Sequence, residues 1–485
     1  MKDFKYYLDT IGEVGYVSSF AGSIVYLNGL PKVKPNEVVL FENGYFGEVN
    51  ALHPDSVEIL LFSSSQIPIG TRVVRTNEQL SIPVGKELLG KIISPLIKSY
   101  KEQFTLPLAH KNINNEPLGI EYRHQVTDPM ETGVTIVDML VPIGKGQRQL
   151  ILGDRKTGKS TFLKQTIAAQ SKAGVICIYA AIGKKQSEIK ELEEYCQSLN
   201  ILQNVIIVAS LPEDSSGLVY LTPYSAMAIA EYFRDIGNDV LIVFDDLYMH
   251  AKYCREIALL AKRFPGRNSY PVNIFFLHSK LLERAGNFLV NNSIRSITAL
   301  PVMETTQGDI SGYIQTNLIS MTDGHVFFDS DLFSKGRRPA INPFLSVTRV
   351  GHQTQTQLKR EISRELISFL TISEKLSSYT HFSAELNIAT KQILQLRERI
   401  ISFLDQLQTE SIPSCVQVIV FVLIWSNIWN MDNPIELKQN ITKIKNTYNT
   451  NQNYKNTLDD TINKATSFNA LIRNIQINKT KIIAI

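Results

Sequence analysis

Short apolar or alternating runs fill the first part of the chain. They lie at residues 15–19, 23–27, 38–41 and 57–62, with glycine, asparagine and proline residues between them. Short strands at regular spacing with such turn residues between them are typical of a small barrel or sandwich. The pattern therefore predicts an all-β domain over residues 1–76. It carries no catalytic constellation, so we interpret this domain as a structural collar.

From Ile82 onward, strand-like and helix-like segments alternate. Continuous apolar runs at 174–181, 205–209 and 240–244 predict buried strands, whereas residues 185–198 and 223–236 have the spacing of amphipathic helices. Buried strands that alternate with helices favour a parallel sheet covered on both faces. We therefore predict a multi-domain chain with a central α/β domain over residues 77–355.

From about residue 356 the pattern becomes helical. Apolar side chains recur at spacings of 7, 3, 4, 3 and 4, as on one face of a helix: Leu386, Ile393, Leu396, Ile400, Phe403 and Leu407. We predict a helical domain over residues 356–485. Beyond residue 430 the chain is rich in Asn, Lys, Thr and Ile. For that part, the sequence is compatible both with further helices and with a loosely ordered segment.

Composition narrows the class of protein. The 485 residues are 44% hydrophobic and 20% charged, which describes a globular chain with ample core. The net charge of +4 is scattered and does not favour nucleic acid as a partner. The longest apolar run, 416–425, is far shorter than the roughly 20 residues of a membrane span. No signal segment opens the chain, so we expect a cytoplasmic protein. The four cysteines lack the spacing of metal ligands and are expected to be reduced.

Candidate chemistry centres on residues 149–161. A short apolar strand is followed by GDRKTGKS, which fits the pattern G-x-x-x-x-G-K-[ST], and then by a helix-like segment. Glycines let successive N–H groups face a phosphate at a helix N-terminus. Lys159 is expected to reach the β- and γ-phosphates and Ser160 to ligate Mg²⁺. The alternative is a surface turn. As ligands of ATP or ADP we assign Gly153, Asp154, Arg155, Lys156, Thr157, Gly158, Lys159, Ser160 and Thr161.

Asp245 is the second candidate for the Mg²⁺ shell. It ends the apolar run 240–244, and a carboxylate at the end of a strand beside a phosphate loop is where nucleotide triphosphatases hold the metal. Asp245 and Asp246 could instead cap the helix that follows. The two interpretations are compatible.

Long segments resemble the alpha subunit of the F-type rotary ATP synthase. They are 132–162, 240–267, 275–285 and 296–351, and the last begins SITALPVMETTQGD. The similarity covers most of residues 15–430, and the Asp-Arg pair inside the phosphate loop is an alpha-type feature. The resemblance implies an N-terminal β-barrel, a RecA-like P-loop domain and a C-terminal helical bundle. It also implies a hexamer of alternating alpha- and beta-type subunits around a gamma-type shaft, peripheral to the membrane and not inserted in it.

The resemblance also implies which sites hydrolyse ATP. Catalytic beta subunits carry a glutamate as general base, and alpha subunits carry glutamine at the same position. Here the segment Ala-Ile-Gly-Lys-Lys places Lys184 there. An ammonium cannot accept a proton from water at neutral pH unless burial strongly shifts its pKa. We therefore predict that the chain binds Mg-ATP but hydrolyses it poorly. The Lys184 side chain could contact a phosphate or point into solvent, and the sequence does not decide between these two positions.

Three further residues carry over from the family. Arg349, in SVTRVG, matches the alpha residue that reaches into the neighbouring beta site, where an arginine in trans stabilises the transition state. Its alternative is an intrachain salt bridge. Gln406 and Gln408 match two glutamines that contact the adenine ring, although the alignment there needs a one-residue insertion. The alternative is that both glutamines are ordinary polar residues on the surface, without a role in binding.

Several departures from the family suggest a divergent, mollicute-type machine. The N-terminal arm is nearly absent, residues 286–295 are shorter than their counterpart, and Lys184 replaces glutamine. An F-like motor that hydrolyses ATP for another task is therefore an alternative to an ATP synthase. A Rho-like RNA translocase would keep an acidic residue at position 184 and add RNA-binding loops. A scaffold without nucleotide would not need Lys159, Ser160 and Asp245.

Overall fold

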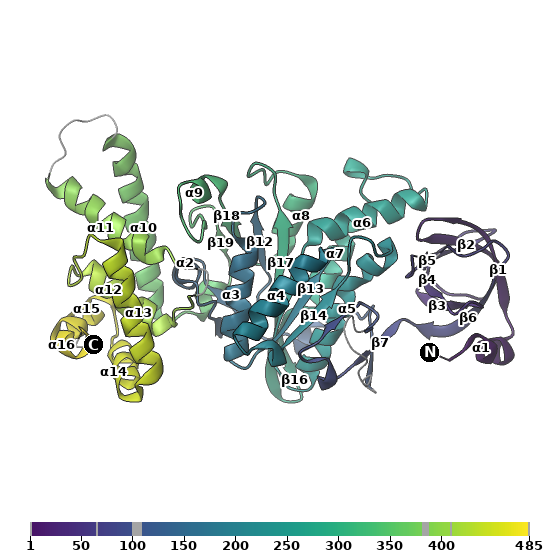
Figure 1. The fold of residues 1–485 in the computed structure, drawn as a ribbon, viewed down its shortest axis with the longest axis horizontal. Coiled ribbons are helices and arrows are strands. Elements are labelled where there is room, and N and C mark those ends of the chain that lie inside the picture. The colour runs from purple at the N-terminus through teal and green to yellow at the C-terminus, as the bar shows by residue number, and fades with distance from the viewer. Residues whose placement is uncertain (1, 65, 99–108, 381–387, 408–409, 484–485) are drawn as a thin grey trace. The chain divides into compact units, whose positions relative to one another are not determined.

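The computed structural model describes residues 2–64, 66–98, 109–380, 388–407 and 410–483 (Figure 1). The chain divides into two compact units. Unit 1 comprises Met1–Gln125, Ser171–Thr305 and Asp309–Thr322, and unit 2 comprises Val126–Gln170, Thr306–Gly308 and Asp323–Ile485. These units cut across the three ranges predicted from the sequence, and the exact domain boundaries stay a prediction.

Unit 1 begins with a closed barrel of antiparallel strands, so the predicted N-terminal barrel is confirmed (Figure 1). Its core is made of buried aliphatic and aromatic side chains such as Val25, Phe41 and Ile59. The strands pair in the order β1-β2-β5-β4-β3-β6. Their bounds are β1 Val14–Ala21, β2 Ile24–Gly29, β3 Glu37–Phe41, β4 Phe46–Leu52, β5 Val57–Leu61 and β6 Arg72–Gln79.

A helix, α1 (Phe4–Ile11), precedes the barrel, so the all-β expectation for residues 1–76 was wrong at its start. The Asp3 side chain accepts a hydrogen bond from the Tyr6 N–H and caps the helix. Gly12 ends it in a left-handed conformation, with φ of 70°. One apolar face, with Tyr7 buried, packs on the barrel. These cap signals were present in the sequence.

The rest of unit 1 contains a parallel sheet in the order β17-β15-β13-β14-β8, as the apolar runs predicted. β16 and β17 form an antiparallel hairpin, and helices α4, α5 and α6 pack against the sheet. The strands are β8 Ile92–Ile93, β13 Ile176–Ala181, β14 Val205–Ala209, β15 Val240–Asp245, β16 Gly286–Val290 and β17 Ser293–Glu304, with the separate pair β7 Ser81–Val84 and β9 Ala109–Asn112. The helices are α4 Gln186–Ser198, α5 Ser216–Asp235, α6 Leu247–Leu260, α7 Ile274–Glu283 and α8 Tyr313–Met321, with short 3-10 turns at Lys86–Leu88, Ile120–Tyr122, Leu202–Asn204 and Arg267–Ser269.

Helix α5 begins at Ser216 and not at Pro223, where the sequence pattern placed its start. The Ser215 hydroxyl accepts a hydrogen bond from the Leu218 N–H and caps the helix, so Pro223 lies in its interior. Proline is common at the first turn of a helix, which explains the error.

Unit 2 holds β12 (Gln149–Gly153), which pairs in parallel with β18 (Gly324–Phe328). β19 (Val347–Thr348) adds an antiparallel edge to β18. The remaining elements of this part are β10 Pro129–Met130, β11 Ile143–Gly144, α2 Thr135–Leu140, α3 Lys159–Lys172, α9 Ser330–Ser334 and a 3-10 turn at Gly351–Thr354.

The C-terminal part of unit 2 is helical, and the described tail beyond residue 430 continues as helices. They are α10 Gln357–Thr380, α11 Ile388–Leu404, α12 Ser414–Trp425, α13 Pro434–Thr450, α14 Gln452–Asn463, α15 Phe468–Ile477 and α16 Lys479–Ile483. The long apolar run forms α12, which is buried on all sides at the centre of these helices. Among the predicted stripe residues, Leu386 lies outside the described residues and Leu407 follows the end of α11. Within the described ranges, no helix has the length and apolar character of a membrane span.

Candidate functional site

The predicted phosphate loop lies in unit 2 between β12 and α3. Gly153 ends the strand with φ of 153°, and a Cβ there would lie 2.4 Å from the Phe328 carbonyl oxygen. Only glycine therefore allows β12 to pack this closely on β18. Gly158 has φ of 103° at the start of the helix, again a conformation that favours glycine.

The side chains of the loop are fixed by backbone groups of the loop and of Gly308. The Lys159 Nζ donates hydrogen bonds to the carbonyl oxygens of Gly153 at 2.8 Å and Asp154 at 2.5 Å. The Thr157 hydroxyl donates to the same Asp154 carbonyl at 2.7 Å. The Asp154 carboxylate accepts from the Gly308 N–H at 2.9 Å. The loop is therefore preorganised, with its lysine buried against the end of the strand.

The N-terminus of α3 has the properties of an anion site. The helix is 14 residues long, and its first turn, which the structure describes in full, contains no acidic side chain. Its N–H groups and dipole favour an anion, and Lys159 adds a positive charge at the same end. The Ser160 side chain lies exposed on the first turn, where its hydroxyl can serve as a metal ligand. These donors fit a phosphate group with its Mg²⁺.

The second predicted element, the end of β15, lies in unit 1 and carries an ion cluster. The Tyr179 hydroxyl donates a hydrogen bond to Asp245 Oδ2. The Lys184 Nζ lies 2.8 Å from Asp245 Oδ1 and 3.8 Å from both Asp246 Oδ2 and Glu188 Oε2. Lys184 thus does not extend freely into solvent, since its side chain is only 16% exposed. Its ammonium is paired with the carboxylate that the sequence assigns to the Mg²⁺ shell.

For the aspartate pair, the helix-cap interpretation is confirmed, and the metal-shell interpretation stays a prediction. The Asp246 side chain accepts a hydrogen bond from the Met249 N–H at 2.6 Å and caps α6. Asp245 takes no part in this cap and faces Tyr179 and Lys184. It fits a metal shell as a carboxylate at the end of a strand, but only if Lys184 moves away or a metal-bound water lies between.

Electrostatics keep Lys184 charged. Burial disfavours its ammonium, but Asp245 and Asp246 outweigh this effect and raise the pKa of Lys184. Burial also raises the pKa of Asp246, and the Lys184 charge opposes that shift. The pKa of Tyr179 is raised by burial and by the Asp245 carboxylate, so the phenol stays neutral. A lysine with a raised pKa cannot act as a general base at neutral pH.

Arg349 follows β19 in unit 2, and several contacts fix its backbone. Its N–H donates to the Asp323 carbonyl at 2.9 Å, and the Asp323 carboxylate is held by Arg148 through Nε at 3.0 Å and Nη2 at 2.7 Å. A Cβ on Gly351 would lie 1.7 Å from the Pro142 carbonyl oxygen, so the following turn packs tightly as well. The Arg349 side chain is exposed. A fixed backbone that presents an exposed guanidinium suits a contact with another chain.

Comparisons with known proteins match this arrangement. A family profile described as "ATP synthase alpha/beta family, nucleotide-binding domain" matches residues 133–348. The ATP synthase subunit alpha of Helicobacter acinonychis (strain Sheeba) is 38% identical over 422 residues, which are 87% of this chain and 84% of the relative. That of Ehrlichia ruminantium (strain Gardel) is 40% identical over 422 residues, 84% of this chain and 82% of the relative. The chain belongs to the ATP synthase alpha/beta family. The similarity to subunits named alpha supports an F-type alpha subunit, part of a rotary ATPase.

Gln406 of this family member is buried, with 4% of its surface exposed. Its Oε1 accepts from the Thr135 N–H at 3.0 Å, and its Nε2 donates to the carbonyl oxygens of Gly133 at 2.7 Å and Glu410 at 2.6 Å. It is not an ordinary surface residue. Gln408 lies outside the described residues. Adenine contacts for the two glutamines stay a prediction.

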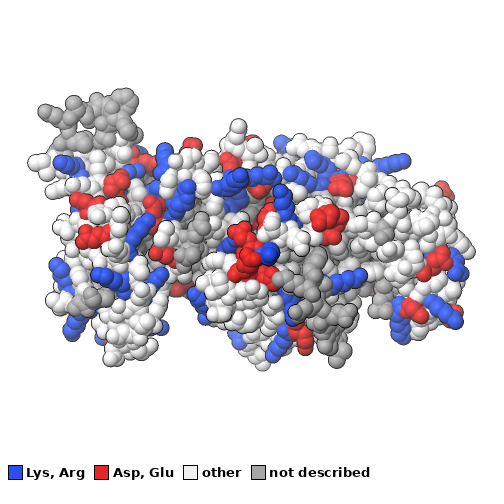
Figure 2. Space-filling model, viewed as in Figure 1, with Lys and Arg blue, Asp and Glu red and all other residues white. Residues whose placement is uncertain are grey.

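Charges of both signs are mixed over the face that Figure 2 shows, and acidic side chains gather over α4. The exposed members on that helix are Glu188, Glu191 and Glu194. The four cysteines of this alpha/beta family member are free thiols, as predicted. Across the described ranges, no group of His, Cys, Asp and Glu has the geometry of a metal site.

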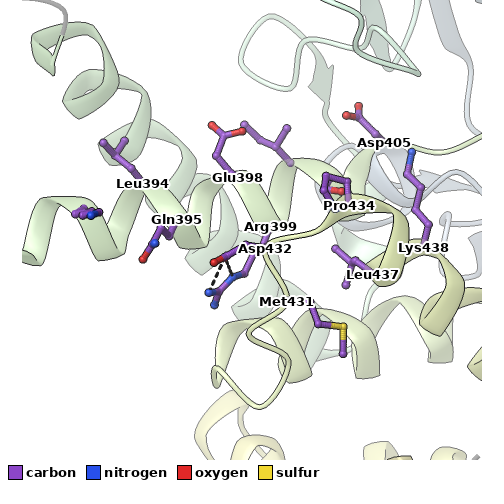
Figure 3. A pocket seen from close by; sticks show the side chains of 13 residues that line it. Leu394, Gln395, Glu398, Arg399, Asp405, Met431, Asp432, Pro434, Leu437 and Lys438 are labelled. Carbon is purple, nitrogen blue, oxygen red and sulfur yellow. Dashed lines mark hydrogen bonds and ion pairs between the residues drawn. The ribbon is translucent and has the colours of Figure 1, made fainter.

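A cavity of about 660 Å³ lies between α11 and the start of α13 in unit 2 (Figure 3). Its wall carries an ion pair between Arg399 and Asp432, with nitrogen and oxygen 2.9 Å apart. The lining alternates Lys391, Glu398 and Lys438 with apolar side chains. Among the described residues of this lining, none is a predicted nucleotide ligand.

Proposed function

We propose that this chain is a nucleotide-binding but non-catalytic alpha-type subunit of an F-type rotary ATPase. It binds Mg-ATP at its own phosphate loop, and its Arg349 completes the catalytic site of a neighbouring beta-type subunit. The observation that carries the proposal is the pairing of Lys184 with Asp245, because it places a lasting positive charge where a catalytic subunit needs a base.

Nucleotide binding rests on the phosphate loop and on the start of α3. The N–H groups there and the Lys159 ammonium would hold the phosphates, and Ser160 and Asp245 are the residues assigned to Mg²⁺. When bound, Mg²⁺ neutralises phosphate charge. The Gln406 amide forms hydrogen bonds with backbone groups of residues 133, 135 and 410. It would therefore hold the segment around residue 406 near the adenine ring of the nucleotide.

The site of this chain would hydrolyse ATP poorly. Loss of a general base typically lowers a rate by a factor of about 10² to 10⁴. Glu188 is the carboxylate near Lys184 that lies outside the aspartate pair. It is ion-paired to Lys184 at 3.8 Å, and its side chain is 52% exposed. A solvated carboxylate that faces an ammonium is poorly placed to activate water, so it does not replace the base.

Arg349 would act in trans. An arginine that stabilises the charge on the transferring phosphoryl group is worth about 10³ to 10⁵ in rate. Its planar fork can pair bidentately with phosphate oxygens, which lysine cannot do. The partners that follow are beta-type catalytic subunits in an alternating hexamer and a gamma-type central shaft, in a complex peripheral to the membrane.

The first experiment uses the purified chain alone. Binding of the fluorescent analogue trinitrophenyl-ATP is measured in Mg²⁺, together with ATP hydrolysis. We expect binding without appreciable turnover. Rapid hydrolysis by the chain alone would refute the non-catalytic assignment, and a lack of binding would refute the nucleotide site.

The second experiment uses the complex with its beta-type partner. Arg349→Lys keeps the charge but removes the fork, so we expect normal assembly and a loss of turnover by about 10³ or more. The control is Arg360→Lys, an exposed arginine on α10. An unchanged rate for Arg349→Lys would show that Arg349 does not act in trans.

A further inference from the structure

A cavity within unit 1 holds a buried carboxyl group. The cavity has a volume of about 300 Å³ and is lined by residues of strand β4 and of helices α5 and α7. We propose that it binds a small organic cation, a primary ammonium with a short apolar stem, and that Glu48 supplies the counter-charge. This inference concerns a second site and does not rest on the proposed function.

The walls of this cavity are fixed by close packing of the barrel on α5. A Cβ on Gly217, in the first turn of α5, would lie 2.3 Å from the Leu61 carbonyl oxygen of β5. On β4, the Val49 side chain belongs to the barrel core. Because successive side chains of a strand point to opposite faces, Glu48 is directed out of the barrel, into the cavity. Glu48 is 6% exposed, so its carboxyl group is largely shielded from water.

Among the described residues that line the cavity, two are cations, and both are already paired. Arg284 donates from Nε and Nη2 to the Glu231 carboxylate at 2.8 and 2.9 Å, and from Nη1 to a backbone carbonyl at 2.8 Å. The Lys280 ammonium is paired with the Glu116 carboxylate. Each of these two positive charges is therefore balanced by a carboxylate other than Glu48.

Glu48 has an uncharged partner. Its Oε1 accepts a hydrogen bond from the Asn114 Nδ2 at 2.8 Å. Burial raises the pKa of Glu48 to about 8, and the hydrogen bond from Asn114 opposes this shift only in part. A buried charge without a counter-charge is strongly unfavourable, so the carboxyl group is neutral at pH 7 unless a cation joins it. An ammonium that binds beside Glu48 would gain its counter-charge when the carboxyl group releases its proton.

Aromatic rings and a hydroxyl group complete the site. Tyr220, Tyr224 and Phe276 line the cavity, and the faces of such rings attract ammonium ions. The Tyr220 hydroxyl lies near that of Tyr224. Even so, no group among the described residues forms a hydrogen bond of good geometry with the buried Tyr224 hydroxyl, whose oxygen can accept one from an ammonium. Burial raises the pKa of both tyrosines, so they stay neutral. Leu277 and Leu281 offer an apolar wall to the stem.

The test measures binding of butylamine and of the uncharged butan-1-ol to the full chain by isothermal titration calorimetry. Butylamine carries an ammonium at pH 8, as a lysine side chain does. We expect its dissociation constant at pH 8 to be at least about tenfold lower than that of butan-1-ol, the size of one charge-assisted contact. The ionised fraction of Glu48 rises from about 1% at pH 6 to about 50% at pH 8, so the affinity for butylamine should rise by up to about 50-fold.

Two variants locate the binding. Glu48→Gln keeps the shape of the neutral carboxyl group but cannot ionise, so it should bind the amine no better than the alcohol at either pH. Glu87→Gln removes an exposed carboxylate that does not line the cavity and should behave like the unmodified chain.

Three results would overturn the proposal. They are a lack of butylamine binding, equal binding of amine and alcohol by the unmodified chain, and a preference for the amine that Glu48→Gln retains. The first two need only the unmodified chain, so the test remains decisive even if Glu48→Gln does not fold.

Discussion

Lowering the pH from 7 to 5 should loosen the region where α6 packs against α5 and α7, because two buried histidines there must stay neutral. His250 Nδ1 lies 3.0 Å from His278 Nε2, and His250 Nε2 lies 3.1 Å from the Tyr220 carbonyl oxygen. His250 and His278 are 0% and 1% exposed. Burial lowers the pKa of His250 to about 4. Burial, with the neighbouring His250, lowers the pKa of His278 well below its usual range.

The change in folding stability follows from the difference in proton uptake between the folded and the unfolded chain. The folded chain cannot take up the proton that the unfolded chain accepts near pH 6.5, so stability is full above that pH and falls as the pH drops toward 4. Between pH 7 and 5, His250 alone accounts for a loss of about 2 kcal/mol. Tyr220, Tyr224 and Cys254, which also contact or surround this pair, remain uncharged over the range because burial raises the pKa of each.

Hydrogen exchange measured by mass spectrometry on peptides of α5 and α6, corrected for intrinsic exchange rates, is the suitable assay. Tryptophan fluorescence is not, because Trp425 and Trp429 both lie in unit 2. The control variant His250→Phe/His278→Leu removes both titrating groups. Its absolute stability can differ, so the comparison is the change between pH 7 and 5.

That comparison also cancels the contributions that other titratable groups make to the pH dependence of stability. Burial raises the pKa of Glu48 to about 8, and a carboxyl with a raised pKa makes the folded state more stable as the pH falls. This contribution is the same in both proteins. An equal pH dependence in the unmodified chain and in the double variant would refute the reasoning.

Three further predictions concern the nucleotide site and Arg349. Lys159→Ala should weaken trinitrophenyl-ATP binding by at least about tenfold, because a charge-assisted phosphate contact is lost. It should also lower the melting temperature, because the carbonyl oxygens of Gly153 and Asp154 lose their donor. Gly351→Ala places a Cβ 1.7 Å from the Pro142 carbonyl oxygen. We expect this clash to destabilise the chain by about 1–3 kcal/mol in thermal unfolding. Turnover of the complex should fall as well, because Arg349 is displaced. Gln406→Ala leaves buried backbone groups such as the Gly133 carbonyl without their partner, which should cost about 1–3 kcal/mol by the same thermal assay.

Much of the fold could be predicted because its signals are local. The continuous apolar runs marked β13, β14 and β15, and the glycine and lysine spacing marked the turn between β12 and α3. The apolar run 416–425 was predicted to be too short for a membrane span, and it forms the buried helix α12. In each case the period or the motif lies within a few residues, where sequence reasoning is strongest.

Other features depend on residues that are distant in the sequence. Gln406 could be read as a surface residue, because nothing nearby shows that its amide meets Gly133 and Thr135. The pairing of His250 with His278 could not be predicted either, because these residues meet only when α6 and α7 pack together. In contrast, the missed helix α1 has local cap signals at Asp3 and Gly12, so that error lay in the interpretation.

Lys184 shows how far a single substitution can be interpreted. The sequence reveals a lysine where a base is expected, but only the pairing of β13 with β15 shows that its charge meets Asp245. A glutamate in its place would put a fourth carboxylate beside Asp245, Asp246 and Glu188, and like charges at such distances repel strongly in a buried site. Lys184→Glu alone would therefore place a carboxylate at this position but also remove the positive charge that compensates Asp245 and Asp246. The ammonium that rules out a base at position 184 is thus also the charge that stabilises the buried aspartate pair.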